Sequence, residues 1–288
     1  MYNHNQYHNH FEHISVFAPV RPFIKWVGGK NQLLPEIHKV YPEGLGSTYT
    51  KYAEPFVGGG AVLFDILNRY DLQEIYISDI NRELMLSYQI IRDNVKKLIP
   101  LLQTLQDQFI PLDTDNRKEF YYKKRKQFNS LKQSNKTLTE QIETAALFIF
   151  LNKTCFNGLY RVNQNGQHNV PMGSGNAPTI CDADNLTAVS ARLQNVCIIS
   201  GDYQLAEWFI DEKTFVYFDP PYRPLTATAA FTTYSEVPFD DAEQKRLADF
   251  VTKMSRRGAK VVVSNSDPKN ADENDNFFDK LYIGSRIK

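Results

Sequence analysis

The sequence has few cysteines and no long apolar run. Its 288 residues include three cysteines, Cys155, Cys181 and Cys197, which have neither the spacing of a zinc site nor the pattern of a disulfide framework. The longest wholly apolar run, residues 145–151, is far too short to span a bilayer, and the N-terminus lacks the apolar core of a signal peptide. We therefore expect a soluble protein of the reducing cytoplasm that contacts neither a membrane nor a metal ion.

The chain also has no excess of charge of either sign. Its 33 basic and 33 acidic residues give a formal net charge of zero, so only a local patch could bind nucleic acid. An apolar content of 42% and an aromatic content of 13% are sufficient for a hydrophobic core. Residues 1–19, in which histidines lie among Asn, Gln and Tyr, differ from the rest. We expect them to form a disordered polar tail, with a metal-binding tract as the alternative.

The most informative stretch is an apolar run that ends in an acid and two prolines. Residues 215–218 are Phe-Val-Tyr-Phe, and Asp219, Pro220, Pro221 and Tyr222 follow. This pattern predicts a buried parallel strand that ends at the prolines, where ligands bind in open α/β sheets. Because the prolines lack N–H donors, the carbonyl groups and the Asp219 carboxylate would form an acceptor cluster suited to a substrate amino group. Tyr222 adds a flat face for a planar ring, although a purely structural turn is the alternative.

A glycine-rich turn follows the first predicted strand. The strand covers residues 49–53, the turn 54–60 ends in three consecutive glycines, and a helix is expected over 61–70. Strand, glycine turn and helix in this order are typical of a nucleotide-binding α/β sheet, although the glycines can also serve helix packing alone. Asp79 follows a second strand over 74–78, at the point where an acid binds ribose hydroxyl groups.

Further strands are predicted in the sequence before and after the acid-proline strand. They cover residues 195–200 and 260–263, with a helix over 240–254 between them and the start of a last strand at 281–283. Asp202 follows the first of these strands, where an acid serves either as a helix cap or as an acceptor for a ligand. The pattern predicts an α/β fold with a Rossmann-like sheet.

Residues 93–194 interrupt this alternation with helices and a polar loop. We expect them to form an inserted recognition domain within a discontinuous catalytic domain of residues 20–92 and 195–288. A helix over 117–132 carries seven basic residues and one acid. This local charge either contacts DNA phosphates or forms a solvated face. The basic residues at the centre of the helix are Lys123, Lys124 and Arg125.

A polar hairpin with its turn at residues 163–166 is expected next. A ribbon that bears Arg, Asn and Gln side chains can enter a major groove, because Arg can bond guanine and Asn or Gln can bond adenine. Polar hairpins are common, so composition alone leaves the role of this one open.

Five blocks of the chain resemble, in order, the motifs of Dam-type DNA adenine-N6 methyltransferases, the alpha-group or D12 class. The resemblance begins near residue 22 and continues to the C-terminus. The blocks are Phe23-Ile24-Lys25-Trp26-Val27-Gly28-Gly29-Lys30, the glycine turn with Ser78-Asp79-Ile80-Asn81, the hairpin with Asn157-Gly158-Leu159-Tyr160-Arg161-Val162-Asn163 and Asn169-Val170-Pro171, Gly201-Asp202-Tyr203, and Asp219-Pro220-Pro221-Tyr222.

The resemblance implies transfer of a methyl group from S-adenosylmethionine to N6 of an adenine flipped out of a short double-stranded DNA site, with GATC the most frequent target in the family. It implies catalytic roles for Asp219, Pro220, Pro221 and Tyr222. It implies cofactor contacts from Trp26, Lys30, Phe56, Gly58, Gly60, Asp79, Asp202 and Tyr203. DNA contacts would come from Phe156, Asn157, Arg161 and Asn163. We expect double-stranded DNA as the partner; the oligomeric state is open, with a monomer favoured.

The chain departs from the family pattern in two places. Many relatives carry Gly-Arg-Tyr after Asn-Val-Pro, with the arginine reading guanine, whereas this chain has Ser174 at the arginine position, so another short adenine site stays open. Relatives also complete the sheet edge with a strand beyond the point where this chain ends, Lys288. The alternatives are an inert DNA-binding relative and an N4-cytosine methyltransferase, which usually has Ser in place of Asp219. Whether a restriction enzyme accompanies the protein is open.

Overall fold

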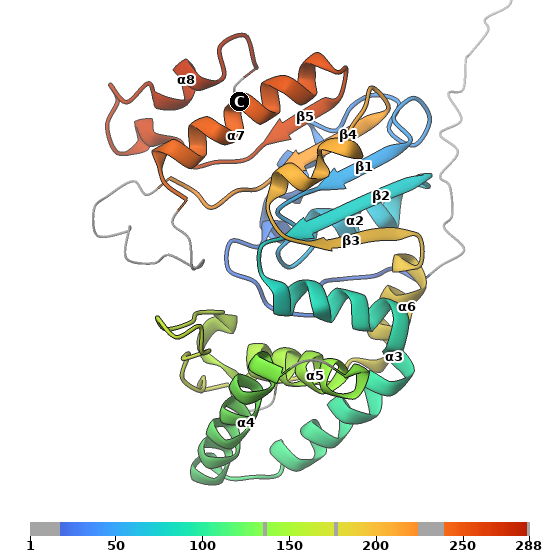
Figure 1. The fold of residues 1–288 in the computed structure, drawn as a ribbon, viewed down its shortest axis with the longest axis vertical. Coiled ribbons are helices and arrows are strands. Elements are labelled where there is room, and N and C mark those ends of the chain that lie inside the picture. Colours follow the sequence, from blue (N-terminus) through green and yellow to red (C-terminus); the bar gives the residue numbers. More distant parts are fainter. Residues whose placement is uncertain (1–17, 135–136, 176–177, 224–238, 287–288) are drawn as a thin grey trace, which may run out of the picture.

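Five parallel strands form the sheet on which the described part of the chain is built (Figure 1). The computed structural model describes residues 18–134, 137–175, 178–223 and 239–286. The strand order is β3-β2-β1-β4-β5. The strands are β1 (Lys51–Glu54), β2 (Glu74–Asp79), β3 (Val196–Ser200), β4 (Thr214–Phe218) and β5 (Lys260–Val263). The predicted α/β fold with a Rossmann-like sheet is confirmed.

Helices connect the strands. The α-helices are α1 (Leu34–His38), α2 (Ala61–Arg69), α3 (Arg82–Phe109), α4 (Thr114–Ser134), α5 (Leu138–Thr154), α6 (Ala183–Leu193), α7 (Asp241–Arg256) and α8 (Phe277–Leu281). Of these, α3, α4, α5 and α6 lie below the sheet in Figure 1, whereas α7 and α8 lie above it. The short 3₁₀ helices are η1 (Lys30–Gln32), η2 (Phe156–Gly158), η3 (Tyr203–Trp208) and η5 (Pro268–Asn270).

The sheet separates two hydrophobic cores. Side chains alternate along each strand, so Phe215 and Tyr217 of β4 join the core that contains α2, α3 and α6, whereas Val216 and Phe218 join the core that contains η3 and α7. All five residues of β4 are buried, as expected of a parallel strand covered on both faces. Because helices cover both faces, the carboxyl edge of the sheet remains the place where polar groups from several strands can meet a ligand.

The inserted helices pack as a layer of their own. α3 has a non-helical residue at Asn94, with φ −138° and ψ 25°, so its first part lies against the sheet and its second part continues into the lower layer (Figure 1). α5 packs against both α3 and α4, and its residues 144–152 are buried without a break. A helix that is apolar on all sides has to lie at the centre of such a layer. The longest apolar run of the sequence, residues 145–151, thus lies in this buried helix.

Several sequence-based boundaries differ from the structure by one to three residues, and one predicted element is absent. The first strand begins at Lys51 rather than at residue 49. The strand predicted to start at 281–283 is wrong: the N–H groups of Lys280 and Tyr282 donate to carbonyl groups four residues earlier, so the end of α8 and the turn after it occupy this segment. Phe278 stacks on Tyr282 at a centroid distance of 6.3 Å, and this spacing of four residues fits a helix rather than a strand. Residues 1–17 of the predicted polar tail lie outside the described residues.

Gly60→Ala is expected to lower the free energy of unfolding by about 3 kcal/mol, because an added Cβ meets both backbone strain and a buried neighbour. Gly60 has φ +74°, and its Cβ would lie 2.5 Å from the hydroxyl oxygen of Tyr88. Gly28→Ala is the matched control: Gly28 has φ +77° with no atom of the described residues within 4 Å of the added carbon, so we expect a loss of about 1 kcal/mol. Urea unfolding measures both, and equal losses would contradict the steric argument.

Candidate active site

Polar groups from four strands converge at the carboxyl edge of the sheet. Asp79, at the end of β2, accepts hydrogen bonds from the backbone N–H groups of Gly58, at 3.1 Å, and Asn81, at 2.9 Å. The backbone N–H of Gly201, after β3, donates to the carbonyl of Asp79 at 3.0 Å. Asp219 directly follows β4, which pairs with β1. The sequence-predicted acids Asp79 and Asp219 therefore lie on one edge of one sheet.

Lys30 forms an ion pair with Asp219 at this edge. Its Nζ atom lies 2.7 Å from Oδ2 of Asp219 and donates a second hydrogen bond to the carbonyl of Gly28 at 2.8 Å. Both side chains are largely buried, with exposed fractions of 7% for Lys30 and 19% for Asp219. Burial lowers the pKa of Lys30, but the charge and hydrogen bond of Asp219 outweigh burial and raise this pKa above its usual value. Lys30, predicted to contact the cofactor, thus also holds the predicted catalytic carboxylate.

Asp219 keeps one oxygen unused. Its Oδ1 atom is buried and accepts no hydrogen bond from the described residues. Burial raises the pKa of this carboxyl group, and the charge of Lys30 opposes the increase. The ring of Tyr222, half-exposed, lies with its centroid 4.8 Å from Nζ of Lys30. The arrangement offers a buried acceptor beside an aromatic face, which is what an amino group on a planar ring requires.

Trp26 lies directly on the glycine turn. A Cβ at Gly58 would be 2.8 Å from Cδ1 of Trp26, and a Cβ at Gly59 would be 2.8 Å from its Cβ. Gly58 and Gly60 also have positive φ angles, of +49° and +74°. Close approach of the indole and left-handed backbone both require glycine here. The structure thus brings together Trp26 and the glycine turn, which the sequence places in separate blocks.

Phe56 and Tyr203 pack against each other on the β3 side of the edge. Their rings stack with centroids 5.2 Å apart, and the buried hydroxyl of Tyr203 has no hydrogen-bond partner among the described residues. Asp202 caps η3 by accepting from the N–H of Gln204 at 2.9 Å, and it forms an ion pair with Arg246 at 2.7 Å. Asp202 therefore serves as a helix cap in this structure, while Oδ2 contacts α7.

A network behind the acid-proline turn was not identified from the sequence. Arg223 donates to Asp241 at 2.7 Å and to Asp275 at 2.6 Å, and its backbone N–H donates to Oδ1 of Asn265 at 3.2 Å. Gln244, buried in α7, donates to the carbonyl of Pro221 at 3.0 Å. These contacts attach the turn to α7 and to the segment after β5. Of this network, Asn265 could have been found from the sequence, because it lies between two serines directly after the predicted strand 260–263.

Glu54 is a second group that sequence reasoning did not place in the site. It ends β1, is buried, and accepts a hydrogen bond from the hydroxyl of Tyr52 at 2.7 Å. Burial holds its pKa well above the usual range, and the nearby charge of Asp219 raises it further. A signal for it was present, because Glu54-Pro55 repeats, one strand away, the acid-proline pattern of Asp219-Pro220.

The predicted hairpin forms, with its pairing limited to a bridge between Val162 and His168. Phe156 precedes it and is half-exposed at 50%, and Asn157 has a left-handed φ of +53°. Arg161 is exposed and donates from Nε to Asn169 at 2.8 Å. The side-chain carbonyl of Asn163 accepts from two N–H groups of the turn, both at 3.0 Å, so this residue shapes the turn. Ser174 is exposed, and Asn176 lies outside the described residues.

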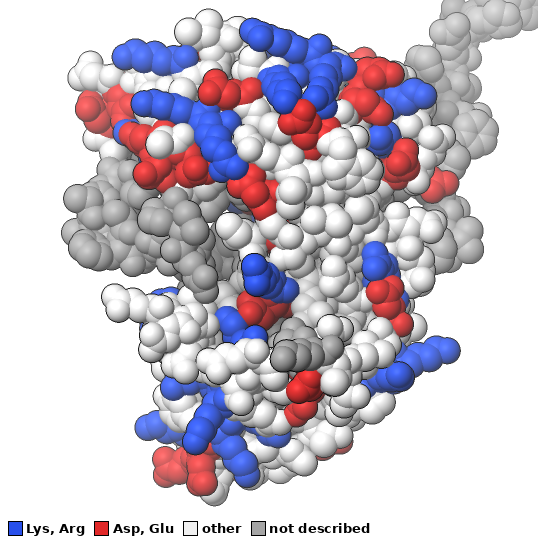
Figure 2. All heavy atoms as spheres, viewed as in Figure 1, with Lys and Arg blue, Asp and Glu red and all other residues white. Residues whose placement is uncertain are grey.

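The basic residues of α4 divide into two groups. Lys118, Lys123 and Lys126 are exposed. The other four make contacts within the protein. Arg125, for example, donates to the carbonyl of Val170 at 3.0 Å. Burial lowers the pKa of Lys124. Figure 2 shows Lys and Arg side chains over the lower end of the molecule, around α4, with some acidic side chains among them. Part of the charge counted in the sequence is therefore structural. The four are Arg117, Lys124, Arg125 and Lys132.

In the described part of the chain, no group of three or more His, Cys, Asp and Glu residues is arranged to hold a metal ion. Over the same residues, no helix combines the length and the apolar character needed to cross a membrane.

A parallel sheet with a glycine turn after β1, an acid after β2 and an acid-Pro-Pro-Tyr turn after β4 defines a Rossmann-like methyltransferase. A family model described as D12 class N6 adenine-specific DNA methyltransferase matches residues 26–288. The chain therefore belongs to the D12 class of N6 adenine-specific DNA methyltransferases, as its motifs predicted.

Individual relatives carry the same class of name. The chain is 48% identical over 270 residues, 93% of this chain and 90% of the relative, to the type II methyltransferase M.MjaIII of Methanocaldococcus jannaschii. It is 38% identical over 256 residues, 88% of this chain and 84% of the relative, to the type II methyltransferase M1.LlaDCHI of Lactococcus lactis subsp. cremoris. It is 33% identical over 247 residues, 86% of this chain and 81% of the relative, to the DNA adenine methylase of Escherichia coli K12.

Proposed function

We propose that this enzyme transfers a methyl group from S-adenosylmethionine to N6 of an adenine flipped out of a short site in double-stranded DNA. The observation that carries the proposal is the buried Oδ1 atom of Asp219, an acceptor without a partner among the described residues, beside the exposed face of Tyr222. An adenine stacked on Tyr222 would present its amino group to this oxygen. GATC is the first site to test, and the absence of arginine at Ser174 keeps other short adenine sites open.

The residues at the carboxyl edge fit the proposed cofactor. The indole of Trp26 lies where a Cβ at Gly58 would be, so it would form one wall of the cofactor site against the bare backbone of the glycine turn. Asp79, at the end of β2, would accept hydrogen bonds from ribose hydroxyl groups. The hydroxyl of Tyr203, which has no hydrogen-bond partner among the described residues, would be available to the cofactor beside Phe56. When bound, S-adenosylmethionine supplies a methyl group activated by a sulfonium.

In the proposed mechanism the protein prepares the nitrogen. The lone pair of N6 is conjugated with the adenine ring, which makes the nitrogen a poor nucleophile. Asp219 Oδ1 would accept one N–H and the carbonyl of Pro220 the other; Gln244 already occupies the carbonyl of Pro221. Both hydrogen bonds let the nitrogen become pyramidal and direct its lone pair toward the methyl group. After transfer the nitrogen carries one surplus proton, and Asp219, with its pKa raised by burial, is the base positioned to take it.

The purified full-length chain is expected to transfer tritiated methyl groups from S-adenosylmethionine to duplex DNA and to yield N6-methyladenine on nucleoside analysis. Sequencing of methylated bases in DNA from cells that express the chain identifies the site. A duplex whose target adenines are already methylated is the matched control and should accept no label. N4-methylcytosine as the product, or cofactor binding without any transfer to DNA, would refute the proposal.

A further inference from the structure

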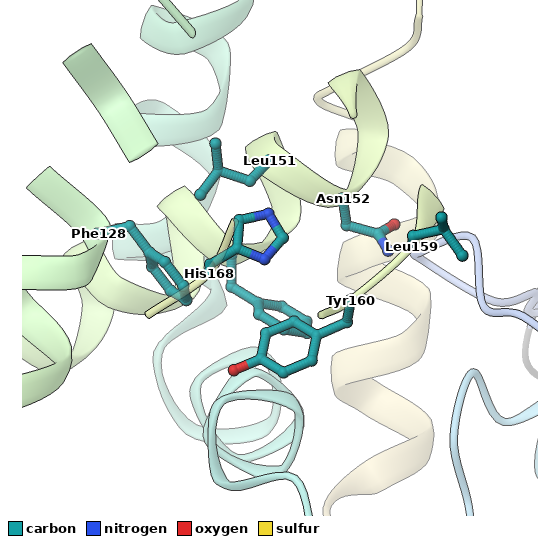
Figure 3. A pocket seen from close by; sticks show the side chains of 7 residues that line it. Phe128, Leu151, Asn152, Leu159, Tyr160 and His168 are labelled. Carbon is teal, nitrogen blue, oxygen red and sulfur yellow. The ribbon is translucent and has the colours of Figure 1, made fainter. Parts of the chain in front are cut away.

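Tyr160 of the recognition hairpin contacts the cofactor side of the molecule through its ring. The ring stacks on Trp26 with centroids 6.4 Å apart and planes at 20°. The same ring also stacks on His168 of the hairpin, at 5.5 Å and 27°. Figure 3 shows Tyr160 and His168 from close by, with Phe128 of α4 beside the imidazole. Because Trp26 lies on the glycine turn, an unbroken series of stacked rings joins that turn to the hairpin.

The hydroxyl of Tyr160 makes a second connection between the same two regions. It donates to Oε2 of Glu83, at the start of α3, at 2.9 Å. It also accepts from Nζ of Lys132, in α4, at 2.9 Å. α3 begins directly after its N-cap residue, Asn81, whose backbone N–H donates to the carboxylate of Asp79.

Lys132 completes the connection. Its ammonium group has three hydrogens, and three acceptors surround it: the hydroxyl of Tyr160, the carbonyl of Gly166 in the hairpin turn at 2.9 Å, and Oε1 of Glu83 at 3.1 Å. The exposed fractions of Lys132 and Glu83 are 12% and 17%, so water screens this pair far less than a surface ion pair. Lys132 is thereby used within the protein rather than on a phosphate.

Backbone groups near Trp26 and at the start of the hairpin are also connected, through the side chain of Asn152. Asn152, at the end of α5, accepts from the N–H of Lys25 at 2.9 Å and donates to the carbonyl groups of Lys25 and Gly158, at 2.7 and 3.0 Å. Trp26 follows Lys25, so the segment that positions the indole also positions the start of the hairpin. Asn152 holds the two backbones together, whereas Tyr160 connects them through side chains that a single substitution can change.

From these contacts we infer that Tyr160 is a positioning residue that couples the cofactor site to the recognition hairpin. The inference rests on the proposed function. A cofactor bound against Trp26 and Asp79 restrains both elements that hold Tyr160, so part of the entropy cost of ordering the hairpin on DNA is already met. DNA then binds more tightly when the cofactor site is filled, and by linkage the cofactor binds more tightly by the same factor when DNA is present.

Tyr160→Phe tests the coupling, because it keeps the stacked ring and removes the hydroxyl that bonds Glu83 and Lys132. The measured quantity is the ratio of the dissociation constants for DNA without and with S-adenosylhomocysteine. The DNA is a short unmethylated duplex that contains the site identified as the target of the enzyme. We expect a ratio of about 5 or more in the unaltered protein and a fall of at least about threefold in Tyr160→Phe. The reciprocal ratio, from calorimetry of S-adenosylhomocysteine with and without duplex, should fall equally.

Tyr282→Phe is the matched control, because the buried hydroxyl of Tyr282 has no hydrogen-bond partner among the described residues, so its ratio should equal that of the unaltered protein. If Tyr160→Phe does not fold, Glu83→Gln, which keeps the shape of the side chain and removes its charge, must show the same fall. General damage would weaken both affinities without changing the ratio, and an unchanged ratio overturns the inference. A protein that methylates adenine with an unchanged ratio refutes the coupling alone, whereas absence of methylation in the unaltered protein refutes the proposed function.

Discussion

Asp219→Ala is expected to lower the rate of methyl transfer about a hundredfold to a thousandfold at saturating cofactor and DNA, the size of effect seen when one electrostatic contact to a reacting group is removed. The substitution removes Oδ1, the acceptor proposed for the adenine amino group, and the base proposed for the surplus proton. The glycine turn and Asp79 stay intact, so the dissociation constant of S-adenosylhomocysteine should change little. Transfer of tritiated methyl groups to duplex DNA measures the first quantity, and calorimetry measures the second.

Lys30 makes a second variant necessary. Without Asp219 its buried ammonium group keeps the carbonyl of Gly28 and the ring of Tyr222 but loses its carboxylate partner, which destabilises the fold. Asp219→Asn keeps the shape and one acceptor oxygen, and its rate should still fall, because the neutral amide is a weaker acceptor and a poor base. Asp211→Asn is the matched control: Asp211 pairs with Lys51 at 3.0 Å, before β4 begins, and its substitution should leave the rate unchanged. Normal transfer by a folded Asp219→Ala protein would contradict the mechanism.

Local sequence was sufficient to predict elements whose own residues have a strong pattern or are followed by residues that end the element. β4 was predictable because four strand-forming residues meet two prolines, and a proline cannot continue a central strand. α5 was predictable from its continuous apolar run. The three apolar residues at 281–283 carried too little periodicity to separate strand from helix, and stacking of Phe278 on Tyr282 decided for α8.

The site could be predicted as a set of blocks but not as a set of contacts. The motifs identified Lys30 and Asp219 separately, and their ion pair depends on the order of strands in the sheet, which local patterns do not encode. The same limit applies to α4, where counting charge left Lys132 on either a DNA-binding or a solvated face, although it lies between Glu83 and Tyr160. Side chains that join distant segments, such as Arg223, had no local signal at all.

The second large effect concerns His168, which the motif comparison left without a role. The imidazole is buried, with 3% of its surface exposed, and neither ring nitrogen has a hydrogen-bond partner among the described residues. The imidazole borders a cavity of about 10 Å³. Figure 3 shows it between the side chains of Phe128 and Tyr160, which also line this cavity. Burial, followed by the positive charges of Arg125 and Lys132, lowers its pKa to about 3.

This shift makes stability depend on pH in a defined direction. Above pH 6.5, the ordinary pKa of the imidazole, His168 is neutral in both the folded and the unfolded chain. Below pH 6.5 the unfolded chain binds a proton that the folded chain excludes, so the free energy of unfolding falls by about 1.4 kcal/mol per pH unit until the folded pKa is reached. Between pH 6.5 and pH 4.5 the loss from this one residue is about 3 kcal/mol.

Other groups titrate in the same range, so the effect has to be measured as a difference between variants. Burial raises the pKa of Glu54, for example, and a carboxyl group protonated in the folded state stabilises the fold as pH falls. His168→Phe keeps a planar ring against Tyr160 without a titrating group, and His168→Gln removes titration with a different shape. Urea unfolding of each protein at pH 7 and pH 4.5 should show both variants losing about 3 kcal/mol less than the unaltered chain. If the unaltered chain and His168→Phe lose the same free energy, His168 is not held neutral by the fold.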